Sequence, residues 1–159
     1  TPVHWIYDEI HAIELAPQVV IGAFSEIVVL ANPALSRVSG KFVVKARVVI
    51  GSNANIRAAG GTIMIGENTL IAQHVSLIAS GHLISTDQPY RDLPWDESRS
   101  GIVIGENVWI GSNATILPGC RIGTNTVIGA GSVVTKSVPE NEVWAGVPAK
   151  KIRDIPIES

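Results

Sequence analysis

Aliphatic residues recur at every sixth position along much of this 159-residue chain. The most regular run is Ile104, Ile110, Ile116, Ile122, Ile128 and Val134, with glycines following at Gly105, Gly111, Gly123 and Gly129. A period of six matches neither the 3.6-residue repeat of a helix nor the two-residue alternation of a long strand. It indicates a short strand followed by a turn, repeated many times.

Looser copies of the same spacing occur upstream, at Ile21 and Ile27, at Val38, Val44, Ile50 and Ile56, and at Ile65, Ile71 and Leu77. We expect three units to close one coil of a triangular solenoid, with the aliphatic anchors pointing inward. Successive coils then pair as parallel strands about 4.8 Å apart. Glycine after the anchor is expected to supply unusual backbone angles at the corners. Left-handed turn positions are expected at Asn53, Asn68, Asn107, Asn113 and Asn125.

The repeat is interrupted twice and then stops. A spacing of nine between Ile56 and Ile65 predicts that three residues around Gly60 bulge out of the coil. A polar segment at residues 80–101 is expected to leave the coil as an ordered loop. In the tail, Pro148 is placed to open a short helix through Ile155. The chain is therefore expected to form one all-β domain over 1–159, with its repeat core at about 20–135 and its tail at 136–159.

Composition narrows the range of partners. Hydrophobic residues make up 46% of the chain and aromatic residues only 5%, so the core must be built from aliphatic side chains. A net charge of −2 gives no general attraction to nucleic acid or to an anionic membrane. No apolar stretch approaches the ~20 residues that span a bilayer, so no membrane insertion is expected. The lone Cys120 excludes an internal disulfide and fits a reducing, cytoplasmic compartment.

The segment from Glu106 to Ile155 contains the motifs WIG, GAGSVVTK and AGVPAK, and Gly81-His82 lies upstream of it. In order and approximate spacing these motifs resemble the hexapeptide-repeat acyltransferases, above all the galactoside and maltose O-acetyltransferases and their polysaccharide-modifying relatives. The resemblance covers roughly residues 50–155. It implies a left-handed β-helix, acetyl-CoA as the acyl donor, and a homotrimer with active sites between subunits. Residues 1–40 do not resemble the helical start of the sugar acetyltransferases, which leaves the acceptor open.

Acetyl transfer from a thioester needs a base that takes the proton of the attacking group, and histidine suits this task near neutral pH. His82 matches the family's Gly-His position, so the resemblance implies that it is the general base. His74 lies within a repeat and is expected to face outward in a structural or acceptor-edge role. His4 and His11 lie outside the matched region.

The resemblance also assigns the two substrates. It implies contacts near the acceptor and the thioester from Asn55, Ser112 and Trp109. Along the pantetheine arm of CoA it implies Ala130, Thr135 and Lys136. Lys150 and Arg153 match basic positions near the nucleotide phosphates, and Lys151 is a neighbour able to assist. Because the whole chain is slightly acidic, such a local basic patch is what a phosphate-bearing ligand requires.

We therefore expect an enzyme that moves an acetyl group from acetyl-CoA to a hydroxyl of a sugar or polysaccharide-type acceptor. N-acetylation of an amino sugar or sugar nucleotide is the alternative. The loop supports a sugar in either case, because charged side chains there accompany Tyr90 and Trp95, a mixture suited to sugar hydroxyls. Two other classes use such a fold: a non-catalytic binding protein and a zinc carbonic anhydrase. The anhydrase needs three converging histidines, whereas only His74 and His82 lie in the appropriate part of the repeat, so no metal is expected.

Overall fold

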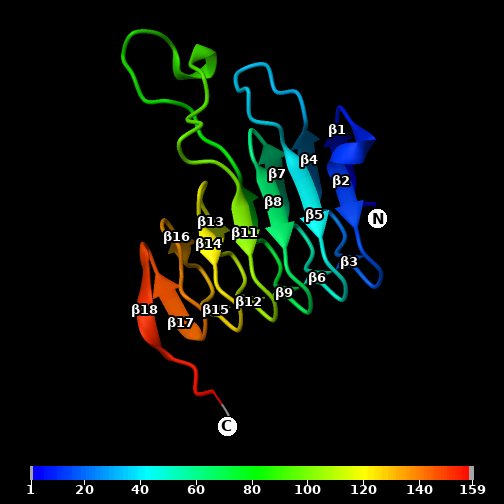
Figure 1. Cartoon of the computed structure of the whole chain (residues 1–159), viewed down its shortest axis with the longest axis vertical. Coiled ribbons are helices and arrows are strands. Elements are labelled where there is room, and N and C mark those ends of the chain that lie inside the picture. Colours follow the sequence, from blue (N-terminus) through cyan, green and yellow to red (C-terminus); the bar gives the residue numbers. More distant parts are fainter. Residues whose placement is uncertain (1, 158–159) are drawn as a thin grey trace.

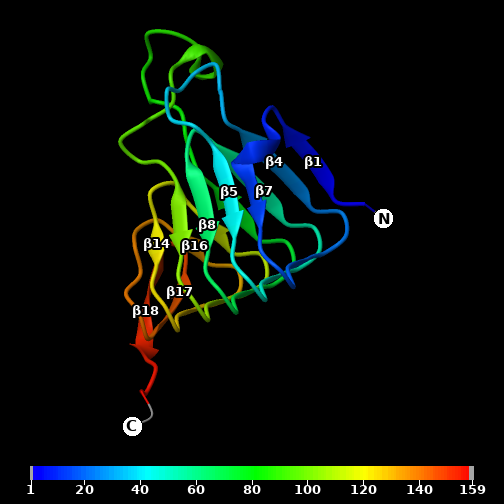
Figure 2. The same cartoon turned by 45° about the vertical axis from the view of Figure 1, so that its right-hand side comes forward.

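The computed structural model describes residues 2–157, which form a three-sided parallel β-helix (Figures 1 and 2). The first sheet contains β1 (His4–Tyr7), β4 (Glu26–Leu30), β7 (Asn55–Ala59), β10 (Ser76–Ile78), β13 (Thr115–Ile116) and β16 (Val133–Val134). The second contains β2 (Ile13–Leu15), β5 (Lys41–Val44), β8 (Thr62–Ile65), β11 (Ile102–Ile104) and β14 (Arg121–Ile122). The third contains β3 (Val20–Ile21), β6 (Val49–Ile50), β9 (Leu70–Ile71), β12 (Trp109–Ile110), β15 (Val127–Ile128), β17 (Glu142–Gly146) and β18 (Ala149–Asp154).

The six-residue anchors form the core, as predicted, except that Ile21 is only partly buried and Val38 lies in the loop between Leu30 and Lys41. Every anchor from Ile104 to Val134 is at most 2% exposed. Equivalent anchors pair in register from one coil to the next, so that Ile27 lies beside Ile56 and Leu77 lies beside Ile116. The coil nevertheless begins upstream of residue 20, because β1 pairs with β4 and β2 pairs with β5. Residues before the recognisable repeat thus build the first coil.

The predicted left-handed asparagines are confirmed. Asn53, Asn68, Asn107, Asn113 and Asn125 all have φ between 52° and 59°. Equivalent asparagines also bond to one another between coils: Asn107 Nδ2 donates to Asn125 Oδ1 at 2.8 Å, and Asn125 Nδ2 donates to Asn141 Oδ1 at 3.1 Å. Side-chain hydrogen bonds therefore continue the backbone ladder along the corner between the second and third sheets.

Glycine is needed after the anchors for a reason other than the unusual backbone angles that we expected. None of Gly105, Gly111, Gly123 and Gly129 is among the positive-φ residues. Instead, the next coil passes very close to them: a Cβ built on Gly111 would lie 2.5 Å from the Ala130 nitrogen, and one on Gly123 would lie 2.3 Å from the Glu140 nitrogen. Real Cβ atoms essentially never approach so closely, so glycine is required by the spacing between coils.

Both long excursions leave the coil at the corner between the first and second sheets. Residues 79–101, which include the 3-10 helix η2 (Tyr90–Asp92), connect β10 to β11, and residues 31–40 connect β4 to β5. The two loops project side by side in both views (Figures 1 and 2). The bulge predicted around Gly60 is wrong: Ala58 and Ala59 are buried in a longer strand β7, and Gly60 makes the turn with φ 66°. Another short 3-10 helix, η1 (Ile10–Ala12), precedes β2 at the same corner.

The helix predicted after Pro148 is also wrong. Residues 149–154 form β18, which pairs antiparallel with β17, and β17 in turn extends the third sheet beside β15. The sheet edge left by the last coil offers unpaired backbone groups, and the hairpin satisfies them as an isolated helix would not. No helix among residues 2–157 is long and apolar enough to cross a membrane.

Candidate functional site

His82 follows β10 at the start of the long loop, on the corner between the first and second sheets. Its Nδ1 lies 3.1 Å from the carbonyl oxygen of Leu93. Because a carbonyl can only accept a hydrogen bond, Nδ1 carries the proton in the neutral ring, and Nε2 is left as an acceptor. The loop therefore holds the imidazole in the tautomer that a general base needs.

His82 borders a small cavity of about 150 Å³ lined by Gly81, Asp96, Arg99, Leu117 and Pro118. The walls come from the loop and from the next coil, so the cavity joins the excursion to the solenoid. The imidazole also packs edge-on against the indole of Trp95, with ring centroids 6.0 Å apart and an interplanar angle of 77°. The backbones of His82 and Trp95 also form an isolated antiparallel bridge, which places the two residues side by side.

The charged residues of this cavity are held by defined hydrogen bonds. The Asp96 carboxylate accepts the Ser98 hydroxyl at 2.5 Å and the Ser98 amide at 3.0 Å, and these bonds lower the pKa of Asp96. Arg99 Nη2 donates to the Thr135 carbonyl oxygen at 2.7 Å. Arg99 thus ties the loop to Thr135, one of the residues expected along the pantetheine arm. Sequence reasoning did not single out Asp96 or Arg99 among the loop charges.

Asn55, Ser112 and Trp109 do not line the cavity beside His82. Asn55 lies on β7 between Glu26 and Ser76, and its Oδ1 is buried without a hydrogen-bond partner in the described part of the chain. Ser112 lies at the corner between the third and first sheets, where its carbonyl oxygen accepts the Gly131 amide. The Trp109 side chain is exposed on the third sheet. Within one chain, these three residues and His82 therefore lie at different places around the three-sided β-helix.

The expected CoA residues occupy the last coil and the hairpin. Ala130 is exposed at the corner between the third and first sheets, whereas Thr135 and Lys136 follow β16 on the same corner as His82. Lys136 Nζ lies 5.4 Å from the centroid of the Trp144 ring, a cation–π distance. The indole thus holds Lys136 at the end of the coil beside the hairpin.

Three cations on β18 differ in their surroundings. Lys151 donates to Asp154 at 2.7 Å and to Glu142 at 2.8 Å, and these bonds raise the pKa of Lys151. Lys150 and Arg153 are exposed and form no ion pair with any residue from 2 to 157. An anionic ligand would therefore meet Lys150 and Arg153 without displacing a partner carboxylate, which is not so for Lys151.

The remaining histidine of the repeat has a structural explanation. His74 adopts φ 59° at the corner between the third and first sheets, where the coils before and after it place Asn53 and Asn113. It fills a left-handed turn position and is exposed. No group of three or more His, Cys, Asp or Glu side chains in residues 2–157 is arranged to hold a metal ion.

The loop at residues 31–40 was missed in the sequence. Its Leu35 carbonyl oxygen accepts the Trp95 amide at 2.9 Å, and its Arg37 amide donates to Glu97 Oε1 at 2.7 Å. The available signal was the repeat itself: six residues after Ile27 stands Pro33 in place of an aliphatic anchor. That failure of the period marks the point where the chain leaves the coil.

Comparisons with known proteins confirm the resemblance seen in the motifs. Residues 101–136 match the family described as bacterial transferase hexapeptide (six repeats). The match is to that segment of the chain, and the three-sided stack of parallel strands is the left-handed parallel β-helix of hexapeptide-repeat acetyltransferases.

Among its relatives is the galactoside O-acetyltransferase of Escherichia coli K12, which is 48% identical over 94 residues, or 59% of this chain and 45% of the relative. The putative lipopolysaccharide biosynthesis O-acetyl transferase WbbJ of the same organism is 44% identical over 99 residues, or 58% of this chain and 50% of that relative. A solved galactoside acetyltransferase in complex with coenzyme A superposes with a TM-score of 0.52 at 32% identity, over 97% of this chain and 64% of that one. The chain thus spans about half the length of the curated relatives that it matches.

Proposed function

We propose that this protein transfers an acetyl group from acetyl-CoA to a hydroxyl of a sugar or polysaccharide-type acceptor. The observation that carries the proposal is the Leu93–His82 hydrogen bond, which leaves Nε2 of an exposed histidine free to accept a proton beside a cavity. The relatives support the same chemistry, since two of them are named as O-acetyltransferases and one was solved with coenzyme A.

In the proposed reaction, Nε2 of His82 takes the hydroxyl proton as the acceptor oxygen attacks the thioester carbonyl carbon. The tetrahedral intermediate then collapses, the carbon–sulfur bond breaks, and the departing thiolate receives the proton from the imidazolium. Protons and electrons balance without a metal or an oxidant. The Leu93 carbonyl stabilises the imidazolium between the two steps, because it accepts a hydrogen bond from Nδ1–H.

For the donor, we assign Ala130, Thr135 and Lys136 to the pantetheine arm, and Lys150 and Arg153 to the phosphates. Thr135 and Lys136 share a corner with His82, and Arg99 connects that corner to the loop. The thioester would then arrive beside the base while the anionic end of CoA lies toward the hairpin. Charge-assisted bonds of this kind suit phosphate recognition.

The proposal includes a homotrimer in which a neighbouring subunit completes the site with Asn55, Ser112 and Trp109. These residues lie away from His82 in one chain, and the outer face of the third sheet carries an apolar row to be covered. Its members are Val20, Val49, Leu70 and Trp109, each at least 40% exposed. The association state is measured by light scattering at several concentrations. A cytoplasmic location belongs to the same proposal, and the buried, unpaired Cys120 suits it.

The test is an acceptor screen with acetyl-CoA that follows release of the free thiol. Galactosides, maltosides, amino sugars and polysaccharide fragments are compared, so that O- and N-acetylation are separated by the products. CoA affinity is measured alongside by calorimetry without acceptor. Thiol release only with hydroxyl acceptors supports the proposal. Release only with amino sugars replaces it by N-acetylation, and absence of CoA binding refutes it.

A further inference from the structure

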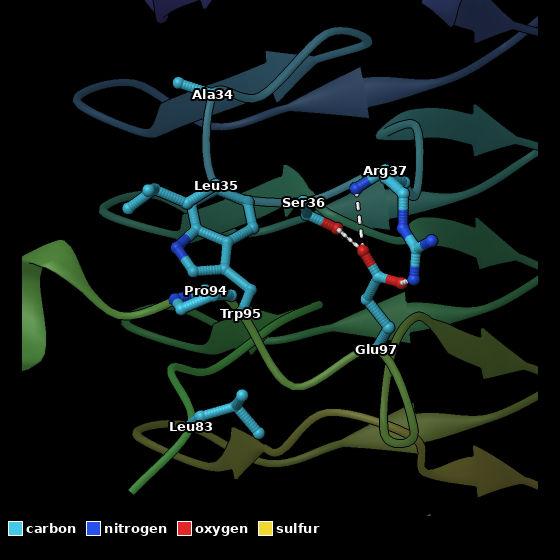
Figure 3. A pocket seen from close by; sticks show the side chains of 8 residues that line it. All are labelled: Ala34, Leu35, Ser36, Arg37, Leu83, Pro94, Trp95 and Glu97. Carbon is cyan, nitrogen blue, oxygen red and sulfur yellow. Dashed lines mark hydrogen bonds and ion pairs between the residues drawn. The ribbon is translucent and has the colours of Figure 1, made fainter. Parts of the chain in front are cut away.

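A cavity of about 570 Å³ lies between the two loops, outside the proposed reaction centre (Figure 3). Leu35, Ser36 and Arg37 from residues 31–40 form one wall, and Leu83, Trp95 and Glu97 from the long loop form the other. The cavity adjoins His82 through Leu83, the next residue in the chain, and through Trp95, whose ring centroid lies 6.0 Å from that of the imidazole.

The indole of Trp95 is rigidly placed. It lies against Gly60, where an added Cβ would be 2.3 Å from Cε3 of the ring, so only glycine permits this contact. The Trp95 amide bonds to Leu35, which fixes the indole to the second loop. The ring nitrogen Nε1 is buried and has no hydrogen-bond partner among residues 2–157. A buried donor without an acceptor is costly, so the indole N–H of Trp95 is sensitive to any change in the packing of its ring.

The polar side chains of the cavity are held in place by hydrogen bonds and together carry no net charge. Glu97 accepts hydrogen bonds from the Arg37 amide at 2.7 Å, from Arg37 Nη2 at 3.1 Å and from the Ser36 hydroxyl at 3.3 Å. The Arg37 side chain remains 92% exposed, so most of its five donors are free. The pair therefore offers donors and acceptors together at no net charge.

We propose that this cavity is a second saccharide subsite, which binds a neutral pyranose unit next to the sugar that is acetylated at His82. The indole and the leucine side chains suit the apolar face of a pyranose, and the Arg37–Glu97 pair suits neighbouring hydroxyls. Zero net charge favours a neutral unit over a phosphorylated or acidic one. The inference rests on the proposed function, and it names the acceptor class as a chain of two or more sugars.

The test observes the orphan donor directly, in protein labelled with [15N]tryptophan. Of the four indole N–H resonances, that of Trp95 is assigned with Trp95→Phe, and the protein is titrated with lactose, maltotriose and chitotriose without acetyl-CoA. The Trp95 resonance should shift in a saturable way with at least one of them, while those of Trp5 and Trp144 stay in place. His82→Ala should bind the same sugar, because no proton transfer is involved.

A matched pair of variants locates the sugar. Ala34 is exposed and lines the cavity, so Ala34→Phe should fill it and weaken sugar binding by about ten-fold or more, while Ala34→Ser should bind as wild type does. CoA affinity should be unchanged in both. If CoA fails to bind but the indole shift remains, the proposed function fails and the subsite stands. The subsite is refuted if thiol is released with a sugar acceptor but none of the three oligosaccharides shifts the Trp95 indole resonance. It is also refuted if dilution of the protein alone produces the shift.

Discussion

The coils after residue 101 and the coils before it both stack short parallel strands around an aliphatic core, but their strands and corners differ in length. After residue 101 the strands β12 to β16 are two residues long and the corners are short. Before it, β4 and β7 are five residues long, and two excursions leave the corner between the first and second sheets. The family match at residues 101–136 falls entirely in the regular part.

The difference separates two tasks. The regular coils and the hairpin carry Thr135, Lys136, Lys150 and Arg153, which we assign to the donor. The irregular coils carry the loops that hold His82 and enclose the cavity beside Trp95. Under the proposed function, the solenoid carries the donor surface and the loops set the acceptor, in line with the general placement of function on loops.

The largest effect is expected from Ile122→Asp in the regular coils. Ile122 is 2% exposed and pairs with Ile104, so the variant buries a carboxylate without a partner, at a cost of several kcal/mol. We expect loss of soluble expression or a large drop in melting temperature by circular dichroism. The neighbouring Arg121→Asp, on the exposed side of the same strand, is the control and should melt close to wild type. Equal melting of Ile122→Asp and wild type would remove Ile122 from the core.

The regular coils are also the part that the sequence predicts best. Burial of each anchor and a positive φ at each turn asparagine follow from six residues of local pattern, and both are confirmed. The reason for the glycines was missed, because the clash at Gly123 involves Glu140 of the next coil. The prediction of a helix in the tail was wrong for a similar reason. Pro148 is a local signal, whereas the pairing of Val143 with Val127 joins residues from different coils.

The candidate site was predictable only where a motif carried it. Gly81-His82 and the basic residues of the tail were found by resemblance, and their roles remain predictions. The second loop, the Leu93 contact that sets the His82 tautomer and the Arg37–Glu97 pair were not found. Arg37 and Glu97 lie sixty residues apart in the chain, and no periodic pattern relates them. Such contacts depend on which loops the coil brings to the same corner.

The second largest effect is expected from His82→Ala, which breaks the acceptor side alone. Loss of the base should lower kcat by about 10²–10⁴. Melting temperature and CoA affinity should stay near wild type, because the side chain is exposed at the edge of the loop. His74→Asn is the control, since asparagine suits the left-handed corner at that position. The proposal is wrong if folded His82→Ala keeps more than about a tenth of the turnover on its true acceptor.

A smaller effect is expected on the donor side from Lys150→Ala combined with Arg153→Ala. Each lost charge-assisted bond to a phosphate is worth about 1.5–3 kcal/mol, so the KM for acetyl-CoA should rise by about ten-fold or more with little change in kcat. Lys45→Ala combined with Arg91→Ala removes the same charge elsewhere on the surface and controls for long-range attraction. Unchanged affinity for CoA at low salt in the first pair would exclude these two residues from the site.

The smallest effect is expected from Glu97→Gln, which loosens the contact between the two loops. Hydrogen bonds from the Arg37 amide and guanidinium lower the pKa of Glu97, so this contact is present at neutral pH and is lost as the pH falls through the lowered value. In neutral solution the Arg37 amide should therefore exchange with deuterium several-fold faster in the variant, with the global melting temperature unchanged because the Arg37 side chain is exposed and Glu97 is only partly buried.

Acid should abolish that difference, because wild-type Glu97 then becomes protonated and resembles the variant. Asp92→Asn is the matched control: within residues 2–157 its carboxylate forms an ion pair with the neighbouring Arg91 and no other side chain, so exchange at Arg37 should not change. A difference between Glu97→Gln and wild type that persists at acid pH would mean that the amide substitution disturbs the loop by another route. If exchange is equal at neutral pH, the carboxylate does not hold the loops together, and the position of Trp95 depends on its Leu35 bond and its packing against Gly60.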